Sequence, residues 1–274
     1  SVRLVGSEMC IRDRYFLVNA FKGDLGDSFI FGEPALKLII QRMPATLELA
    51  LFSLFISLII AIPLGIYAGY KPESKTSKII MGGSILGFSM PTFWVGIIFI
   101  MIFAVHLGWL PSTGRGEIGT FLGINSSLFT LNGLSHVFLP ALNLALFKIS
   151  SVIRLTRAGT REIILQDYIT FARSKGLSEK RIVLVHILKN ILIPIVTVVG
   201  LEFGSLIAFS TVTETVFAWP GMGKLIIDSI YNLDRPVIVA YLMIIVTFFV
   251  FLNLIVDILY TFLDPRVRIK GDSQ

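Results

Sequence analysis

The sequence predicts an all-α membrane protein, and three features of the chain point to this class. Of its 274 residues, 54% are hydrophobic and only 15% are charged. Soluble domains carry about 25% charged residues, so this much apolar surface needs lipid around it. Several apolar segments also reach the roughly 20 residues that a helix needs to cross a bilayer. Finally, lysine and arginine gather in alternate loops between these segments, which is the pattern of a membrane protein with one cytoplasmic side.

Five segments have the length and composition of membrane-spanning helices. Each is dominated by aliphatic and aromatic residues and contains few charges. No internal repeat and no low-complexity linker divides the chain, so we expect one transmembrane domain over residues 43–264. The expected spans cover residues 45–70, 79–107, 136–157, 191–213 and 237–263.

The two ends of the chain differ from this apolar region. Residues 1–14 are polar, include Cys10 and contain no apolar run long enough to span a membrane or to serve as a signal peptide. We interpret them as a non-native start that resembles translated sequencing-adapter read-through; the alternative is a genuine polar arm. We expect residues 15–42 to be the end of an extracytoplasmic segment and residues 265–274 to be a cytoplasmic tail.

The placement of positive charge predicts the orientation of the spans. Cytoplasmic loops carry an excess of lysine and arginine, so the side with more of them is the inside. This placement explains the net charge of +6 by membrane topology and argues against nucleic acid as a partner. The inside loops hold Lys71, Lys75, Lys78, Arg154, Arg157, Arg161, Arg173, Lys175, Lys180, Arg181, Lys189, Arg266, Arg268 and Lys270, and the outside loops hold Arg115, Lys224 and Arg235.

One long polar passage, residues 167–190, lies between two spans and has a helical pattern of its own. Apolar residues recur at helical spacing, a glycine interrupts the pattern, and a Ser-Glu pair can begin a second helix. This pattern predicts a docking element for a soluble partner; the alternative is an amphipathic helix lying on anionic lipid. The residues concerned are Ile164, Tyr168, Phe171 and Ala172 in the apolar pattern, Gly176 at the bend, and Ser178 and Glu179 at the second start.

Two charged residues lie near the middle of predicted spans. Lys148 is central in the third span and Glu202 in the fourth. A lone charge at that depth costs about 3 kcal/mol on insertion scales. We therefore hypothesise that the two side chains face each other or that both line a water-filled pathway. The alternative is that Lys148 reaches toward the membrane surface and Glu202 is protonated or hydrogen-bonded.

The outside loop between the last two spans contains the sequence Phe217-Ala218-Trp219-Pro220-Gly221. An aromatic pair followed by Pro-Gly is typical of a tight turn. We expect its side chains to lie at the level of the lipid headgroups or against another protein. Membrane anchoring alone is the alternative for Trp219.

Other function classes find little support in the sequence. The three histidines, His106, His136 and His186, are scattered, and a single cysteine provides no thiol cluster for a metal. Residues 69–76 imitate a phosphate-binding loop, but Ser74 replaces the second glycine and the segment follows a lipid-length helix instead of a strand. No catalytic constellation is recognisable. An ion-coupled secondary transporter remains an alternative, although it normally shows more intramembrane charges and an inverted repeat.

Short motifs along the chain carry a specific family resemblance. They are GDLGDS at residues 23–28, RMPATL at 42–47, SMPTFW at 89–94, TFARSKGLS at 170–178, ETVFAWPG at 214–221, NLIVD at 253–257 and LDPR at 263–266. With these motifs the chain resembles the permease subunits of ATP-binding-cassette importers of the type I transmembrane fold. It is most similar to the branch for dipeptides, oligopeptides, nickel and glutathione.

This resemblance implies an architecture and a set of partners. Members of the branch have six spans, so one span would precede the five seen here and the chain would be truncated at its N-terminus. The implied location is the inner membrane of a prokaryote, with the coupling loop and the C-terminus in the cytoplasm. The implied partners are a second homologous permease, two ATPase subunits that hydrolyse ATP in place of this chain, and a soluble binding protein. The chain itself would be no enzyme and would bind no cofactor. Di- or oligopeptides are the leading substrates, and nickel and glutathione are alternatives.

The resemblance also assigns roles to individual residues. Residues 167–186 would form coupling helices that dock into a groove of the ATPase. Phe171 departs from the branch's usual Thr-Ala-Arg-Ala-Lys-Gly motif, so side-chain contacts there would differ. The expected coupling residues are Tyr168, Phe171, Ala172, Arg173, Lys175, Gly176, Leu177, Lys180 and Arg181, and the expected contacts with the binding protein are Phe217, Trp219, Pro220 and Gly221.

Overall fold

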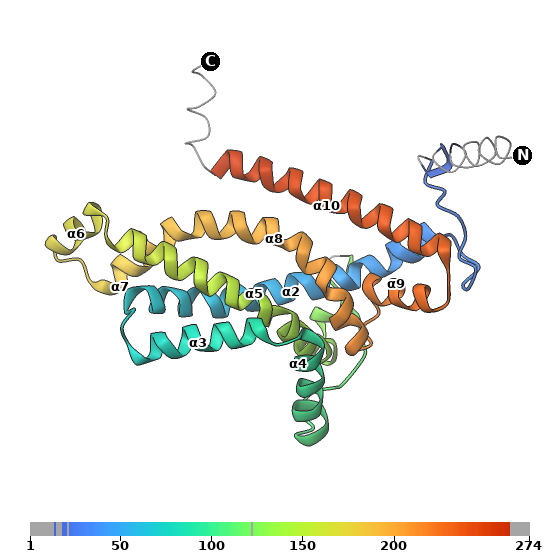
Figure 1. Cartoon of the computed structure of the whole chain (residues 1–274), viewed down its shortest axis with the longest axis horizontal. Coiled ribbons are helices and arrows are strands. Elements are labelled where there is room, and N and C mark those ends of the chain that lie inside the picture. The colour runs from blue at the N-terminus through green and yellow to red at the C-terminus, as the bar shows by residue number, and fades with distance from the viewer. Residues whose placement is uncertain (1–13, 15–17, 21, 122, 264–274) are drawn as a thin grey trace, which may run out of the picture.

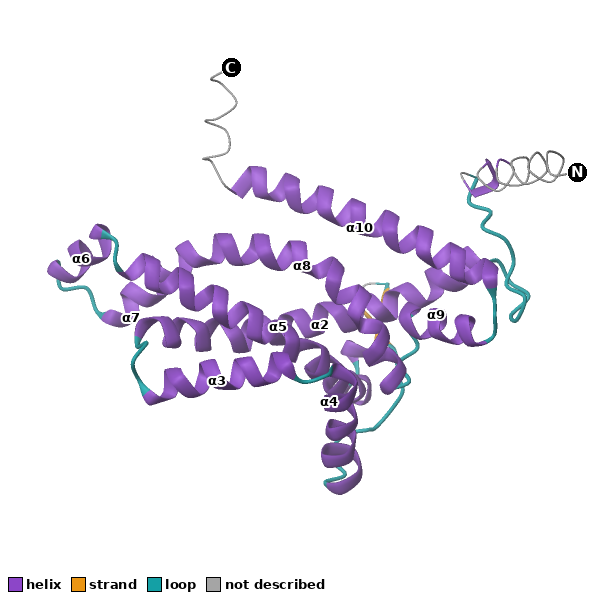
Figure 2. Cartoon of the chain, viewed as in Figure 1, coloured by secondary structure: helices purple, strands orange, loops and turns teal. Residues whose placement is uncertain are grey.

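The computed structural model describes Arg14 and residues 18–20, 22–121 and 123–263, and it is almost entirely helical (Figures 1 and 2). The expected non-native start, apart from Arg14, and the expected tail at residues 265–274 lie outside the described residues. Long helices run roughly along one direction, with α6 and α7 at one end of the molecule and α9 at the other (Figure 1).

The first long helix, α2 (Ala35–Tyr70), begins well before the predicted span at residue 45. Pro34 occupies the N-cap position and the helix begins directly after it, so part of the segment predicted to be extracytoplasmic continues the helix outward. The inward end stops at Tyr70, and Ser74 then caps α3 (Lys75–Ser89) by accepting a hydrogen bond from the Ser77 backbone N–H at 3.0 Å. The stretch that imitates a phosphate-binding loop is therefore a helix–turn–helix connection.

A stripe of small residues lets α2 pack closely on α5 (Leu131–Ile164). The positions recur every four residues on one face of α2, so they form a groove along the helix. A Cβ built on Gly65 would lie 2.5 Å from Thr156 Cβ, and one on Gly69 would lie 2.6 Å from Thr160 Cβ. The close packing of the two helices thus explains why both positions are occupied by glycine. The stripe consists of Ser53, Ser57, Ala61, Gly65 and Gly69.

The segment predicted as a span over residues 79–107 is not a single straight helix. The segment breaks after Ser89, and α4 (Thr92–Phe99) with its π-helical extension η1 (Ile100–His106) turns away by 104°. Met90 and Pro91 are extended at the break because proline disfavours helical backbone in the residue before it. Figure 1 shows α4 projecting sideways from the bundle. Hydropathy alone does not reveal this break, since both halves are apolar.

The outside loop between η1 and α5 has local structure. Strands β1 (Gly119–Phe121) and β2 (Ile124–Ser126) form a short antiparallel hairpin, followed by the 3₁₀ turn η2 (Ser127–Phe129). The carboxylate of Glu48 ties this loop to α2, because it accepts hydrogen bonds from Arg115, from the Ser127 hydroxyl and, at 3.1 Å, from the Ser127 backbone N–H.

The remaining helices complete the bundle. The short helix α7 (Glu179–Arg181) and the π-helical segment η3 (Ile182–Ile187) lead into α8 (Leu188–Val216), which is followed by α9 (Met222–Tyr231) and α10 (Arg235–Leu263). Within the described residues, α2, α5 and α10 are long and apolar enough to cross a membrane, and two bent pairs raise the number of candidate spans to as many as five. Much of α10 exposes apolar side chains, as expected of a surface that faces lipid or another membrane subunit.

Candidate functional site

The polar passage between the third and fourth predicted spans forms a hairpin at one end of the molecule (Figure 1). It consists of α6 (Asp167–Ser174), a bend and α7, and we call residues 167–181 the coupling hairpin. Gly176 makes the bend with φ of +75°, a backbone conformation that side chains with a Cβ rarely adopt. Ser178 stands at the N-cap of α7, but its side chain makes no capping hydrogen bond. The bend therefore depends on the backbone conformation of Gly176, and the Ser178 side chain does not cap the helix that follows.

The two faces of α6 have different environments. Ile169 is fully buried and Ala172 is 5% exposed, and both belong to the core between α2, α5 and α8. Tyr168 and Phe171 are 43% and 60% exposed on the outer side. Ala172, which we predicted to be an apolar contact for a partner, therefore lies on the inner face of α6 and packs against the core of the chain itself. Leu177 is partly buried and also packs against this core.

The basic residues of the hairpin are exposed, yet one of them is engaged within the chain. Lys175, Lys180 and Arg181 lie at the surface, and the Lys175 ammonium is 4.5 Å from the centroid of the Phe171 ring. Arg173 instead donates through Nε to Glu179 Oε1 at 3.2 Å, and Tyr70 at the end of α2 donates to the same carboxylate. Arg173 thus joins α6 to α7, and Glu179 joins the hairpin to the bundle.

Lys148 and Glu202 meet at the middle of the bundle. Lys148 Nζ lies 3.0 Å from Glu202 Oε2 and 2.9 Å from Ser205 Oγ. The lysine is 5% exposed, whereas the glutamate side chain is 32% exposed. The alternative in which Lys148 extends to the membrane surface is therefore wrong. The ammonium of this pair is therefore buried, whereas the carboxylate is partly exposed at the surface of the isolated chain.

The aromatic turn after α8 does not present its rings to a partner or to lipid. Phe217 is 1% exposed and Trp219 is fully buried, with the indole N–H donating to the Ala45 carbonyl at 2.9 Å. Gly221 is buried and Pro220 is partly buried. These side chains, which we predicted to contact the binding protein, are therefore packed largely inside the described part of the chain. The turn instead folds inward, because the indole finds an acceptor on α2.

A buried carboxylate that the sequence analysis overlooked organises this turn. Glu214 is fully buried and accepts hydrogen bonds from Thr46 Oγ1 at 2.7 Å, Ser210 Oγ at 3.0 Å and the Lys224 backbone N–H at 3.0 Å. The last of these donors belongs to the first turn of α9, where a negative charge is favourable. Gly221 approaches the carboxylate too closely to carry a side chain. The signal for this site in the sequence was the position of Glu214, a charged residue at the end of an apolar run.

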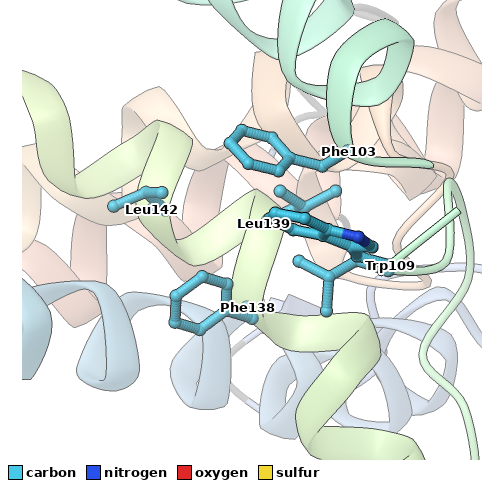
Figure 3. Close-up of a pocket in the computed structure, with 6 residues that line it drawn as sticks. Phe103, Trp109, Phe138, Leu139 and Leu142 are labelled. Atoms are coloured by element: carbon cyan, nitrogen blue, oxygen red, sulfur yellow. The ribbon is translucent and has the colours of Figure 1, made fainter. Parts of the chain in front are cut away.

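A separate apolar pocket of about 400 Å³ lies beside the outer half of α5 (Figure 3). Phe138, Leu139 and Leu142 on α5 face Phe103 of η1 and Trp109 of the following loop. No polar side chain lines it, so it suits an apolar group. Within the described part of the chain, no group of three histidine, cysteine, aspartate or glutamate residues is placed to hold a metal.

A comparison with known protein families identifies the family of this chain. Residues 61–269 match the family model described as the binding-protein-dependent transport system inner membrane component. The chain belongs to this family. It is therefore a multi-pass inner-membrane permease of a bacterial ATP-binding-cassette transporter, and a transport component instead of an enzyme.

Individual relatives are similar over most of this permease. The oligopeptide transport system permease protein AppB of Bacillus subtilis is 40% identical over 254 residues, covering 92% of this chain and 78% of the relative. The dipeptide transport system permease protein DppB is 42% identical in Haemophilus influenzae and 34% in Escherichia coli K12. These two alignments cover 92% and 93% of this chain and 79% and 80% of the relatives.

Solved structures support the fold of the permease. A chain of the inward-facing methionine transporter MetNI aligns with a TM-score of 0.66 at 17% identity, covering 84% of this chain and 97% of that one. A chain of an amino acid transporter crystallised with histidines gives a TM-score of 0.55 at 15% identity, covering 82% and 93%. At these identities the similarity concerns the fold.

The pKa directions around Glu179 predict how the permease's coupling hairpin responds to pH. The hydrogen bond from the Tyr70 hydroxyl is the largest cause that lowers the pKa of Glu179. Because the folded-state pKa of Glu179 lies below its unfolded value, this stabilisation is present above the unfolded pKa and is lost as pH falls through the folded pKa.

We therefore expect amide exchange in α6, corrected for its intrinsic rate, to accelerate as the permease is acidified through the titration range of Glu179. Glu179→Gln should show weaker protection with little pH dependence. Glu73→Gln is the matched control, because Glu73 is 91% exposed at the same end of the molecule. A Glu179→Gln variant that retains the full pH dependence would show that other groups hold the hairpin.

Proposed function

We propose that this permease forms half of the translocation pathway of an ATP-driven importer for di- or oligopeptides. The names of its relatives support the substrate class, since permeases 34–42% identical to it are described as dipeptide or oligopeptide transport proteins. The remaining subunits would be a second homologous permease, two ATPase subunits and a soluble binding protein that delivers the peptide. Exposed apolar surface on α10 and α4 supports contact with other membrane-embedded components.

The observation that carries the proposed coupling is the two-sided environment of α6. Its inner face is part of the core, through Ile169 and Ala172, while its outer face exposes Tyr168 and Phe171. An exposed apolar face on a short helix is suited to a groove of a partner, and the surrounding lysines and arginines would steer the encounter. Because the inner face is packed, a movement of the partner would be transmitted to α5 and α8 as a rigid displacement.

The central ion pair supports a pathway at the middle of the bundle. Charges at membrane depth are expensive and usually face a cavity or another subunit. Lys148 and Glu202 satisfy each other, and the half-exposed carboxylate would border the route that opens alternately to the two sides. ATP-driven closure of the partner subunits would supply the energy for that change of access.

Replacement of Phe171 by alanine tests the coupling role. Phe171 is 60% exposed, so Phe171→Ala should leave the melting temperature of the permease within about 2 °C, as is usual for exposed positions. If Phe171 is an anchor in the ATPase groove, its loss should weaken the association of the permease with its own ATPase subunits at least 10-fold, as measured in detergent.

Tyr231→Ala is the matched control, because this aromatic side chain is 83% exposed on α9 at the opposite end. It should leave ATPase association unchanged. Equal association of wild type and Phe171→Ala, together with vesicle binding by the isolated permease that depends on Phe171, would favour a lipid-surface helix. The transport function is tested separately, because uptake of dialanine into proteoliposomes of the complete transporter should require internal ATP and the binding protein.

A further inference from the structure

A second cavity lies at the break between α3 and α4, and Lys148 of the charged pair forms part of its wall. This space measures about 210 Å³ and is bordered by side chains of α5 and α8 as well as by the break itself. We call it the break cavity. Its lining residues are Phe88, Met90, Thr92, Leu144, Phe147, Lys148, Leu206 and Phe209.

Aromatic rings make up most of one side of the break cavity. Phe88 and Phe147 stack with ring centroids 4.7 Å apart, and the centroid of Phe209 lies 5.8 Å from that of Phe147. Three rings from three helices thus form a continuous apolar surface. Such a surface favours aromatic or large aliphatic groups through area burial and ring stacking.

A single ammonium provides the charge of this cavity. An ammonium has three N–H donors, and Lys148 uses two of them on Glu202 and Ser205. Among the described residues, these are the two hydrogen-bond partners of the ammonium, which also lies 5.6 Å from the centroid of the Phe147 ring in the cavity wall. Since Lys148 is 5% exposed, a ligand anion that reached it would be bound in surroundings of low dielectric, where charge-assisted hydrogen bonds are strong.

We infer that the break cavity binds the C-terminal residue of the transported peptide, with its carboxylate on Lys148 and its side chain against the phenylalanine rings. This inference rests on the proposed peptide transport. The cavity is smaller than the roughly 300–1,000 Å³ of sites that enclose drug-sized ligands, so it suits one residue better than a whole oligopeptide. A peptide C-terminus can combine a carboxylate, which the Lys148 ammonium would bind, with an apolar side chain, which the phenylalanine rings would contact.

If the inference holds, substitutions of Lys148 and of Glu202 should change the affinity for the peptide in opposite directions. Glu202 occupies part of the ammonium's coordination, so it competes with a ligand carboxylate. Removing the competing charge in Glu202→Gln should therefore tighten binding, whereas Lys148→Gln should weaken it. A purely structural ion pair would respond differently, because each substitution breaks the same pair and both would then act in the same direction.

The experiment measures equilibrium binding of tritiated Ala-Phe to the complex of permease and ATPase subunits in lipid nanodiscs, without the binding protein. Ala-Phe should bind at least 10-fold more tightly than its C-terminal amide. Lys148→Gln should remove this difference by weakening Ala-Phe about 10-fold, and Glu202→Gln should tighten Ala-Phe. The double variant Lys148→Gln/Glu202→Gln leaves no unpaired buried charge and should bind as weakly as Lys148→Gln.

The aromatic wall is tested with Phe209→Ala, which should weaken Ala-Phe about 10-fold and leave Ala-Gly unchanged. Phe55→Ala is the matched control, because Phe55 is 59% exposed on α2 and Phe209 is 56% exposed. Equal binding of Ala-Phe and its amide, or weakening by both Lys148→Gln and Glu202→Gln, would overturn the inference. ATP-driven dialanine uptake that persists in that case would leave the proposed function intact.

Discussion

Gly65→Leu should prevent α2 from packing on α5 and should leave little folded permease in detergent. A Cβ at this position would lie 2.5 Å from Thr156 Cβ and 3.0 Å from the Ile153 carbonyl oxygen, and leucine adds further carbons beyond the Cβ. Neither neighbour is the free end of a flexible chain, so the two helices have to separate. Overpacking of a few methylenes costs about 1–3 kcal/mol, and we expect a larger loss here, because α2 and α5 make the most extensive helix–helix contact in the described part of the chain.

The matched control is Gly82→Leu. Gly82 also lies within a membrane helix, but a Cβ there meets no atom within 4 Å. This variant should retain the wild-type melting temperature and elute as a single species in size-exclusion chromatography. If Gly65→Leu were as stable as Gly82→Leu, the close approach of α2 to α5 would not be a feature of the folded permease.

Glu214→Ala should unfold the outer end of the permease. The substitution leaves the buried Thr46 hydroxyl and the Lys224 backbone N–H without this acceptor, whereas the Ser210 hydroxyl can still donate to the Ile207 carbonyl at 2.7 Å. Each unsatisfied buried group costs about 1–3 kcal/mol, so the loss should exceed about 2 kcal/mol. Trp219 should become exposed as the turn loosens, and the measurement is a red shift of tryptophan emission together with a lower melting temperature.

Glu33→Ala is the control for Glu214→Ala, because Glu33 is an exposed carboxylate whose ion pair with Lys37 spans 3.3 Å at the surface. Removing it should change stability by less than about 1 kcal/mol. Glu214→Gln should fall between the two variants, since the amide retains one acceptor but brings an N–H₂ toward backbone donors. A Glu214→Ala variant that melted like Glu33→Ala would mean that water or neighbouring groups satisfy these donors.

The sequence predicted the bend of the coupling hairpin but not the burial of the outer turn. The bend depends on neighbouring residues, whereas the burial depends on residues far away in the chain. The bend at Gly176 follows from residues next to it in the chain, and its φ of +75° is what a glycine between two helices indicates. Phe217 and Trp219 precede a Pro-Gly pair, which correctly indicated a turn. The direction of their side chains depends on α2, which lies about 170 residues earlier in the chain.

The same difference between local and long-range interactions explains where prediction and structure differ within single helices. Helical spacing grouped Tyr168, Phe171 and Ala172 as one apolar face, but only packing against α5 and α8 separates Ala172 from the other two. Likewise, hydropathy found an apolar segment over residues 79–107, and the change of direction after Ser89 emerges only in three dimensions.

Composition and charge placement were sufficient to predict an all-α membrane protein, because hydropathy acts within a few residues of the chain, and the local motifs carried the resemblance to the permease family. Packing between distant helices decided the rest. It buried the aromatic turn under Glu214, brought Lys148 to Glu202, and required glycine at residues 65 and 69, since each of these features depends on atoms that only the folded chain brings together.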